Sequence, residues 1–211
     1  MYKNRYDAGE KLAKKLTQFT EDNPLVLAVP RGGLVTAYET IKEFNFEWDL
    51  IIPRKIGAPH NKEIAIGAVT SDGNFLLDRH QINMLQIPQD YIEKEAYEQT
   101  KEIKRRLSMY KGNEQFPNVK NRTVIIVDDG IATGFTILAA IESVKKHGAK
   151  KVILSVPVGP KDTISRLEDI VDQVICPYIP EHFFAVGRYY DDFTQTEDDE
   201  VFEIINKLRS Q

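Results

Sequence analysis

The stretch Val124–Thr136, VIIVDDGIATGFT, most constrains what this chain can fold into. Its first four residues, Val124–Val127, are apolar and β-branched, which is typical of a strand buried on both faces of a parallel sheet. Asp128 and Asp129 follow at the carboxyl end of that strand. A turn of small residues then leads into a helix predicted to begin near Ile137. The pattern predicts a strand, a turn and a helix in direct succession.

This arrangement presents backbone amides and a helix N-terminus to an anion. Gly130 and Gly134 allow the backbone to approach a ligand closely, and Thr133 and Thr136 add hydroxyl donors. Two adjacent carboxylates suit a different partner, either sugar hydroxyls or the shell of a bound Mg²⁺. The stretch therefore predicts a ligand that carries a phosphate on a ribose.

Other loops share parts of this pattern. The chain has no GxxxxGK[ST] and no GxGxxG, so neither a P-loop nor a dinucleotide-binding fingerprint is present. A receiver domain carries paired aspartates near its start, whereas more than half of this chain precedes them. Phosphatases of the haloacid dehalogenase type need Asp-x-Asp, but Asp128 and Asp129 are adjacent. A solvated strand end is the remaining structural alternative.

VIIVDDGIATGFT resembles the 13-residue phosphoribosyl-pyrophosphate (PRPP) motif of type I phosphoribosyltransferases. The resemblance implies that Asp128 and Asp129 hold the ribose hydroxyls and take part in a Mg²⁺ site. It also implies that a loop wraps the 5′-phosphate, comprising Ala132, Thr133, Gly134, Phe135 and Thr136. One departure concerns the first of these loop residues. The 6-oxopurine enzymes carry an aspartate where this chain, like the adenine enzymes, has Ala132.

Composition supports a globular protein and narrows its partners. The 211 residues are 42% hydrophobic and 28% charged, and the net charge is −4. This charge argues against nucleic acid and anionic membrane as partners. No apolar run approaches about 20 residues, and Met1–Leu16 is charged from the start, so we expect no membrane span and no secretory signal. The single cysteine, Cys176, excludes an internal disulfide and favours a reducing, cytoplasmic location.

Apolar runs alternate with helical patterns along the chain. Helices are expected from a capping box at Asp7–Glu10, after Gly33, over 89–110, near Ile137, over 163–167 and at the end of the chain. The alternation predicts an α/β fold with a doubly wound, mainly parallel sheet in one domain over 1–211. The expected strands are Leu25–Val29, Trp48–Ile52, Val124–Val127, Val152–Val156 and Gln173–Cys176.

A second strand–turn–helix follows the first expected strand, at Pro30-Arg31-Gly32-Gly33. Alone, this sequence fits a structural tight turn equally well. In a chain that resembles the PRPP-binding family, it matches the loop that binds pyrophosphate, with Arg31, Gly32 and Gly33 as ligand contacts. The resemblance also implies a cis peptide, which we predict between Pro30 and Arg31.

A cationic loop punctuated by Gly and Pro, 53–60, is expected to lead into a hairpin formed by 63–70 and 74–77. Such a segment suits a mobile lid, assigned to about 54–80. Arg54 and Lys55 resemble the Arg-Lys pair that opens this loop in adenine phosphoribosyltransferase, and we assign them catalytic roles; solvated surface cations are the alternative. Glu63 is either a general acid/base or a hairpin charge.

An aromatic segment, about 177–196, interrupts the alternation of strands and helices. Core aromatics under a loop are one interpretation. The part IPEHFFAVGRYYDD is similar to the hood of hypoxanthine-guanine phosphoribosyltransferase, with one extra residue before the Val-Gly. That similarity implies that Phe183 stacks on a base and that Asp191 approaches the Mg²⁺-pyrophosphate. The lysine that recognises a 6-oxo group has no clear counterpart, since its place falls near Ile170.

The resemblance covers nearly the whole chain and extends to stand-alone predicted phosphoribosyltransferases that share PRGG, RKIGAP and VDDGIATG. It implies a Mg²⁺-dependent glycosyltransferase of the pentosyltransferase type. The enzyme would move 5-phosphoribose from PRPP to a small nitrogen base and release pyrophosphate. A PRPP- or nucleotide-binding regulatory protein is the alternative, and the reverse reaction is a third option. A homodimer is expected only by analogy.

Overall fold

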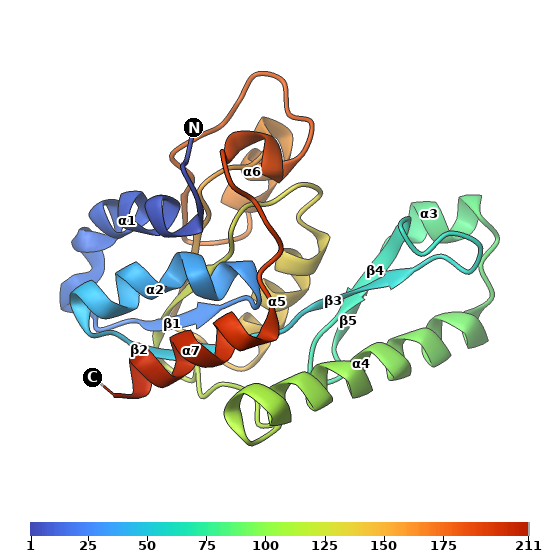
Figure 1. The fold of residues 1–211 in the computed structure, drawn as a ribbon. Helices are drawn as coiled ribbons and strands as arrows, with labels where there is room; N and C mark the ends of the chain where they lie inside the picture. The colour runs from blue at the N-terminus through green and yellow to red at the C-terminus, as the bar shows by residue number, and fades with distance from the viewer. Residues whose placement is uncertain (211) are drawn as a thin grey trace. The chain divides into compact units, whose positions relative to one another are not determined.

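The computed structural model describes residues 1–210 and separates the chain into two compact units. The first unit contains residues 1–50, 117–133 and the chain from 144 onward. The second contains residues 51–116 and 134–143. Figure 1 shows the fold and labels the α-helices and the strands β1 to β5.

The first unit is built on a five-stranded sheet in the order β2-β1-β6-β7-β8, with every neighbouring pair parallel. The central strand, β6, and its neighbours are apolar and buried because helices cover a parallel sheet. Each expected strand is present, with ends that match or differ by at most two residues, and Ile51 and Ile52 lie outside β2. The strands are β1 Leu25–Ala28, β2 Glu47–Leu50, β6 Thr123–Val127, β7 Lys151–Ser155 and β8 Gln173–Ile175.

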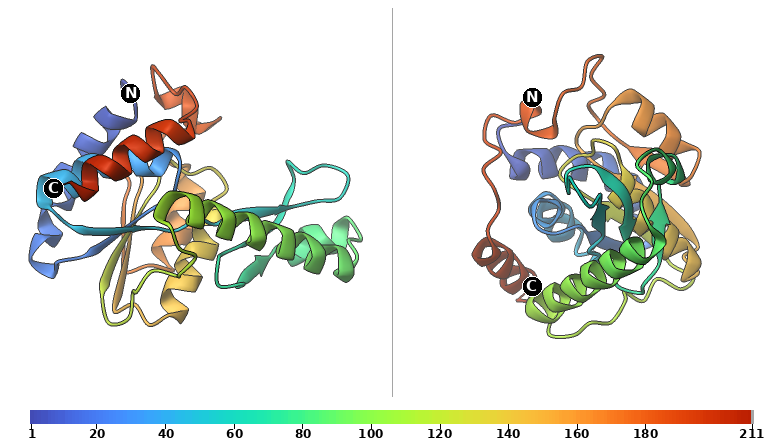
Figure 2. Two further views of the ribbon diagram at one scale, coloured as in Figure 1. Left: turned by 60° about the horizontal axis from the view of Figure 1, so that its bottom comes forward. Right: turned by 90° about the vertical axis from the view of Figure 1, so that its right-hand side faces the viewer.

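Helices α1 (Arg5–Leu16) and α2 (Gly32–Phe44) run side by side in Figures 1 and 2. The packing is close because Gly9 of α1 lies against the backbone of Thr36. The capping box expected at Asp7 would start the first helix about one turn after its observed start. Helix α1 begins at Arg5, and Asn4 is its cap, since the Asn4 side chain accepts a hydrogen bond from the Asp7 amide at 3.0 Å.

The other helices follow the predicted order. In the first unit, α7 (Asp198–Arg209) packs against α2, and α6 (Lys161–Glu168) packs against β8. The short 3-10 helices η1 (Thr17–Asp22) and η2 (Val186–Tyr189) lie in connections. Helix α5 (Phe135–Lys146) follows β6, and most of its residues are grouped with the second unit.

The second unit consists of an antiparallel sheet in the order β3-β4-β5 and two further helices. Its elements are β3 Arg54–Gly57, β4 Ala65–Val69, β5 Phe75–Leu77, α3 Arg79–Met84 and α4 Gln89–Lys111. The predicted hairpin and long helix are present. The segment expected to be a loop at 53–60 is partly a strand, because Arg54–Gly57 pairs with β4.

These elements confirm the predicted α/β class, with a mainly parallel sheet and a small antiparallel one. Among the described residues, no helix is both long and apolar enough to cross a bilayer. The expected lid, about 54–80, lies entirely in the second unit. Treatment of the whole chain as one domain stays a prediction.

Candidate functional site

The two glycine-containing loops predicted to bind a ligand follow neighbouring strands. Strands β1 and β6 pair in parallel, with Ala28 opposite Val127, so both loops leave the same edge of the sheet. The Val29 amide continues this pairing with a 2.9 Å hydrogen bond to the Val127 carbonyl. The chain goes from β1 to β2 on one side and from β6 to β7 and β8 on the other. Ligands of open α/β sheets bind where the strand order reverses in this way.

The loop after β1 has the predicted cis peptide between Pro30 and Arg31. Gly32 and Gly33 follow as the first residues of α2. A Cβ atom on Gly32 would lie 2.0 Å from Asp129 Oδ2 and 2.6 Å from Arg5 Nε, so only glycine fits here. The sequence places this loop and the acid pair about 100 positions apart in the chain, and the fold brings them into contact.

The two acids at the end of β6, Asp128 and Asp129, have different electrostatic surroundings. Asp128 retains some exposed surface, yet desolvation of its carboxyl group and the adjacent Asp129 raise its pKa well above the usual range. Asp128 Oδ1 accepts a hydrogen bond from the Asp129 amide at 2.8 Å. The Asp129 side chain is 17% exposed and pairs with Arg5, since Oδ2 lies 2.6 Å from Arg5 Nε. Asp129 is therefore the member of the pair with a cationic partner.

The turn after the acids is held by the elements around it. Gly130 has φ +146°, and a Cβ atom there would lie 2.5 Å from Val186 Cγ1, so the turn packs directly under the aromatic segment. The Ala132 carbonyl accepts a hydrogen bond from Thr163 at 2.8 Å, and the Thr133 carbonyl accepts one from Arg166 at 2.6 Å. Helix α6 thus fixes the loop expected to hold a phosphate.

The last three residues of the predicted phosphate loop begin the next element of the chain. Gly134 has φ +72°, and α5 starts at Phe135 and Thr136. The amides in the first turn of an α-helix have no acceptor within the helix and carry a partial positive charge. The start of α5 therefore has the local chemistry that favours an anion, and its role in binding a phosphate stays a prediction.

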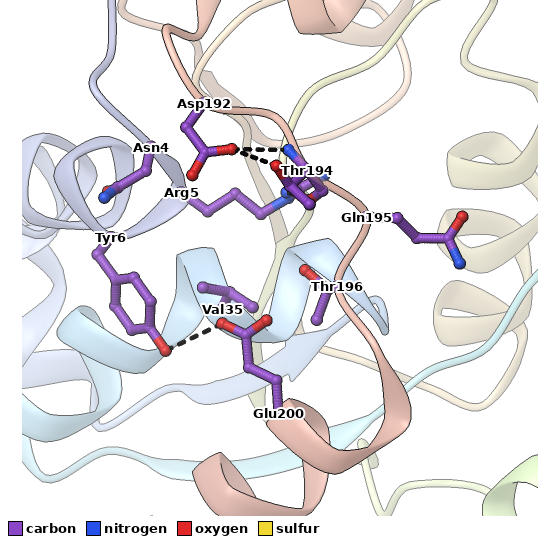
Figure 3. Close-up of a pocket in the computed structure, with 9 residues that line it drawn as sticks. All are labelled: Asn4, Arg5, Tyr6, Val35, Asp192, Thr194, Gln195, Thr196 and Glu200. Carbon is purple, nitrogen blue, oxygen red and sulfur yellow. Dashed lines mark hydrogen bonds between the residues drawn. The ribbon is translucent and has the colours of Figure 1, made fainter.

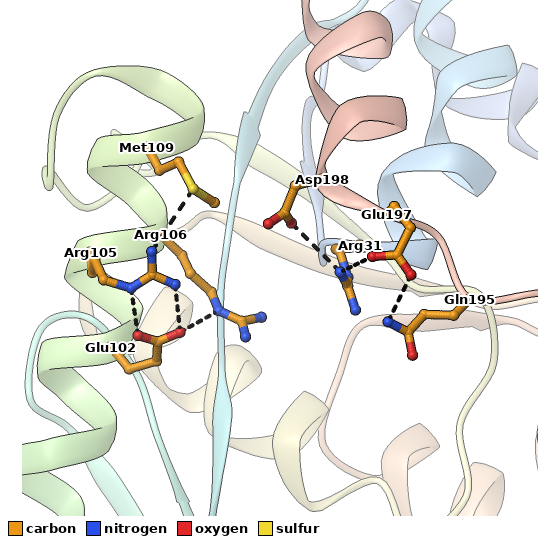
Figure 4. A network of polar contacts seen from close by, with 8 residues as sticks. All are labelled: Arg31, Glu102, Arg105, Arg106, Met109, Gln195, Glu197 and Asp198. Atoms are coloured by element: carbon orange, nitrogen blue, oxygen red, sulfur yellow. Dashed lines mark hydrogen bonds and ion pairs between the residues drawn. The ribbon is translucent and has the colours of Figure 1, made fainter.

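Arg31, predicted to hold a diphosphate, has acidic partners in the first unit. Its Nη1 lies 3.3 Å from Glu197 Oε2 and 3.6 Å from Asp198 Oδ1, at the start of α7 (Figure 4). Gln195 also donates to Glu197 at 3.0 Å. The sequence pattern around residues 195–198 gave no sign of this contact with the glycine loop.

The aromatic segment is a small hydrophobic cluster that also contacts the acid pair. Tyr190 donates a hydrogen bond from its hydroxyl to the Asp129 carbonyl at 2.6 Å. Tyr2 pairs with Tyr190 in a parallel bridge, which ties the N-terminal residues to this segment. Phe183 stacks on Tyr189, with ring centroids 5.6 Å apart, whereas the next residue, Phe184, is 82% exposed. Phe183 is thus engaged with the protein, and Phe184 faces solvent.

Cys176 follows the carboxyl end of β8, and its thiol donates to the Tyr178 carbonyl at 3.4 Å. Burial raises the pKa of its thiol to about 12, so it is protonated and a poor nucleophile at neutral pH. The thiol therefore fits a structural role rather than a catalytic one.

Asp191, the third predicted metal ligand, is exposed, and its amide donates to the Tyr2 carbonyl at 2.8 Å. Within residues 1–210, no three side chains of His, Cys, Asp or Glu gather closely enough to hold a metal ion by themselves. Asp128 and Asp129 are adjacent, but Asp191 does not join them in such a group.

In the second unit, the predicted catalytic cations lie on β3. Arg54 donates to Gln99 Oε1 at 2.5 Å, and burial together with nearby Arg106 lowers the pKa of Arg54. Lys55 pairs with Glu63 at 2.8 Å, and both side chains are exposed. Glu63, whose role the sequence left open, is therefore at least a charge partner of Lys55.

Arg5 is the site residue that sequence reasoning missed. A lone arginine at a helix start carries no motif, and its partner Asp129 lies 124 positions away. Arg5 also lines a cavity of about 160 Å³ (Figure 3). The other residues around this cavity are mostly polar and comprise Asn4, Tyr6, Val35, Asp192, Thr194, Gln195, Thr196 and Glu200.

Comparison with known proteins agrees with this geometry. Residues 1–194 match the model of the phosphoribosyl transferase domain. The chain belongs to the phosphoribosyl transferase domain family. Its similarity extends over nearly the full chain to the crystal structure of the protein TT1426 from Thermus thermophilus, with 35% identity and a TM-score of 0.81. The match covers 98% of both chains.

Curated relatives are also similar. "Putative phosphoribosyl transferase Rv0571c" from Mycobacterium tuberculosis is 38% identical over 208 residues, which are 98% of this chain and 47% of the relative. The chain thus spans about half the length of that protein. A shorter match, 47% identical over 49 residues, covers 23% of this chain and 25% of "Transcriptional regulator GfcR" from Methanosphaera stadtmanae.

Proposed function

We propose that this protein is a Mg²⁺-dependent phosphoribosyltransferase that moves 5-phosphoribose from PRPP to a nitrogen acceptor of the nucleobase class and releases pyrophosphate. One observation carries the proposal. The glycine loop after β1 and the acid pair after β6 meet at the switch point of the sheet, where a Cβ on Gly32 would collide with Asp129. A ligand with a diphosphate and a ribose diol fits this edge, because the glycine loop suits the diphosphate and the neighbouring acid pair suits the diol.

Each end of the ligand has a partner in this proposal. The carboxylates of Asp128 and Asp129 accept hydrogen bonds from the ribose hydroxyls. The backbone of residues 132–136 and the threonine hydroxyls bind the 5′-phosphate, because the start of α5 favours an anion. Arg31, with the amides of Gly32 and Gly33, binds the diphosphate. Phe183 is assigned to the base, as the family resemblance implies.

The chemistry then depends on position and charge. Breaking the bond between the sugar carbon and pyrophosphate leaves positive charge on the ribose and negative charge on the leaving group. The acids lie on the side of the ribose, and Arg31 on the side of the leaving group, so each developing charge has an opposite partner. Arg54 and Lys55 are proposed to add positive charge for the pyrophosphate.

The acidic residues fit a Mg²⁺ ion that arrives with its substrate. Mg²⁺ keeps several waters and is commonly held by one or two carboxylates together with substrate phosphates, rather than by an all-protein cage. Asp128 and Asp129 supply such a pair, and Asp191 is proposed to approach the ion's diphosphate. When bound, the ion supplies positive charge to the leaving pyrophosphate.

A pyrophosphate-release screen tests the proposal. Purified protein with Mg²⁺-PRPP is offered nucleobases and small amines one at a time, and the product is identified by mass. The double variant Asp128→Asn/Asp129→Asn should bring pyrophosphate release to background while circular dichroism remains that of wild type. Transfer at the wild-type rate by the double variant would refute the assignment of the acids.

A second candidate is a PRPP- or nucleotide-binding regulatory protein without transferase activity. Two observations favour it. Ala132 stands where the 6-oxopurine enzymes carry an acid, and a 49-residue part of the chain is similar to a protein named as a transcriptional regulator. Calorimetry separates the two candidates. Binding of PRPP without pyrophosphate release across the whole screen would favour regulation over catalysis.

A further inference from the structure

The N-terminal segment contacts the acid pair through the side chain of Arg5. Arg5 is only 11% exposed, and its Nε donates to Asp129 Oδ2 at 2.6 Å. Its Nη1 donates to the Thr194 carbonyl at 2.8 Å, and its Cζ lies 3.9 Å from the centre of the Phe193 ring. Three different contacts therefore fix one guanidinium group, so it is not a solvated surface cation.

The backbone around Arg5 is fixed as well. The Tyr2 amide donates to the Tyr189 carbonyl at 2.9 Å, and the Asp192 amide donates to the Lys3 carbonyl at 2.9 Å. Asn4 caps α1, which begins at Arg5 itself. The residues before and after Arg5 are thus held on the aromatic segment and on a helix, and the side chain has little freedom to move away from Asp129.

Asp129 in turn has a restricted position. A Cβ atom built on Gly32 would lie only 2.0 Å from Asp129 Oδ2 and 2.6 Å from Arg5 Nε. The carboxylate is therefore held between the glycine loop and the guanidinium. With Oδ2 committed to Arg5, the direction of the other carboxylate oxygen is fixed, and a fixed acceptor binds a diol with a smaller entropic cost than a rotating one.

We propose that Arg5 is a positioning residue of the ribose site, which holds the Asp129 carboxylate in the orientation that receives the sugar hydroxyls. The inference deepens the proposed function and rests on it. Arg5 acts through Asp129 and does not touch the reacting atoms. It also offsets the negative charge of Asp129 at a site meant for a phosphorylated, anionic sugar, which lowers the repulsion that the ligand meets.

Direct binding tests this role without turnover. Ribose 5-phosphate carries the diol and the 5′-phosphate but no diphosphate, so its affinity reports on the acid side of the site. By calorimetry, Arg5→Gln should raise its dissociation constant by about tenfold or more, as expected for the loss of a charge-assisted contact. Arg5→Lys keeps the charge but loses the planar fork of donors. Its affinity for ribose 5-phosphate should therefore lie between those of wild type and Arg5→Gln.

Two further variants separate positioning from stability. Phe193→Leu removes the ring under the guanidinium and should weaken ribose 5-phosphate binding in the same direction, by less than Arg5→Gln. Lys11→Gln is the matched control, because Lys11 belongs to the same helix, pairs with Asp7 at 2.8 Å and lies over the Tyr2 ring. Its ligand affinity should stay within about twofold of wild type.

The outcomes are distinct. If wild type binds neither PRPP nor ribose 5-phosphate, the proposed function fails and this inference with it. If wild type binds both and Arg5→Gln binds them equally well, only the role of Arg5 is refuted. A lower melting temperature of Arg5→Gln with unchanged affinity would also refute it. In a transfer assay, the KM for PRPP should rise in Arg5→Gln far more than kcat falls.

Discussion

Arg31 Nη1 lies 3.3 Å from Glu197 Oε2, so the cation of the glycine loop is paired with a carboxylate at the start of α7. A diphosphate that binds Arg31 has to share it with this acid or replace it. Glu197 is 68% exposed, and exposed ion pairs contribute little to stability. The competition should therefore be modest and sensitive to salt.

Glu197→Gln tests this competition. Removal of the charge should lower the dissociation constant of PRPP by up to about fivefold at low salt, because a pair of this kind contributes about 0.2–1 kcal/mol. The gain should shrink as salt is added. Calorimetry at two salt concentrations measures both effects. Glu203→Gln is the control, since Glu203 lies on the same helix and pairs with Lys207; weaker PRPP binding in Glu197→Gln would contradict the prediction.

Gly32→Ala should damage the site by steric collision. The added methyl would stand 2.0 Å from Asp129 Oδ2 and 2.6 Å from Arg5 Nε, so the ion pair has to move. PRPP binding should weaken by about tenfold or more, a loss of about 1.4 kcal/mol or more. Calorimetry with PRPP measures this change.

Gly148→Asn is the control for that experiment. Gly148 has φ +82°, which asparagine tolerates, and the nearest atom to a new Cβ is 3.7 Å away. Its PRPP affinity should match that of wild type. Equal PRPP affinity in Gly32→Ala and wild type would show that the loop does not meet the ligand as proposed.

Local patterns in the sequence were enough for most of the fold. The run Val124–Val127 and the glycines that follow predicted a buried strand and a turn, and β6 begins one residue earlier. The Pro30–Arg31 cis peptide was also predicted, from the resemblance of the loop. These features depend on residues close together in the chain, so a sequence pattern contains them.

The parts that were missed depend on distant partners. The segment 53–60 is cationic and punctuated by Gly and Pro, which predicts a loop, but pairing with β4 makes Arg54–Gly57 a strand. Arg5 meets Asp129 across 124 positions, and Arg31 meets Glu197 across 166. The error at the start of α1 has another cause, since Asn4 and Asp7 are both good capping residues and only the structure shows which one is used.

Glu102 should make the stability of the second unit depend on acid pH. Hydrogen bonds from Arg105 and Arg106 lower the pKa of Glu102 from 4.5 to about 2 (Figure 4). A lowered pKa means that the folded state binds fewer protons than the unfolded state. The stabilisation is therefore complete above the unfolded pKa and is lost as pH falls from about 4.5 towards 2.

Glu102→Gln measures this contribution. At pH 7 it should lower the free energy of unfolding by about 0.5–1 kcal/mol, given that the pairs lie on a helix surface. As pH falls from about 4.5 towards 2, the wild type should lose stability relative to the variant. Urea unfolding followed by circular dichroism gives both values. Parallel pH profiles for the two proteins would contradict the assignment.

We expect Phe183 to contribute to the stability of the fold and Phe184 to contribute little. Phe183 stacks on Tyr189 at 5.6 Å, so Phe183→Leu should lower the free energy of unfolding by about 1–2 kcal/mol. Phe184 is 82% exposed, and Phe184→Leu should change it by less than about 0.5 kcal/mol.

The same two variants test which ring meets the acceptor base. The proposed role of Phe183 requires that Phe183→Leu raise the KM for the acceptor found in the screen, beyond any change in the KM for PRPP. Phe184→Leu serves as the matched control, because it removes a neighbouring ring of the same size from the same segment. Stacking on a flat ring depends on an aromatic face, which leucine lacks, so the effect should persist at temperatures where both variants are fully folded. A raised acceptor KM in Phe184→Leu alone would transfer the stacking role from the packed ring to the exposed one.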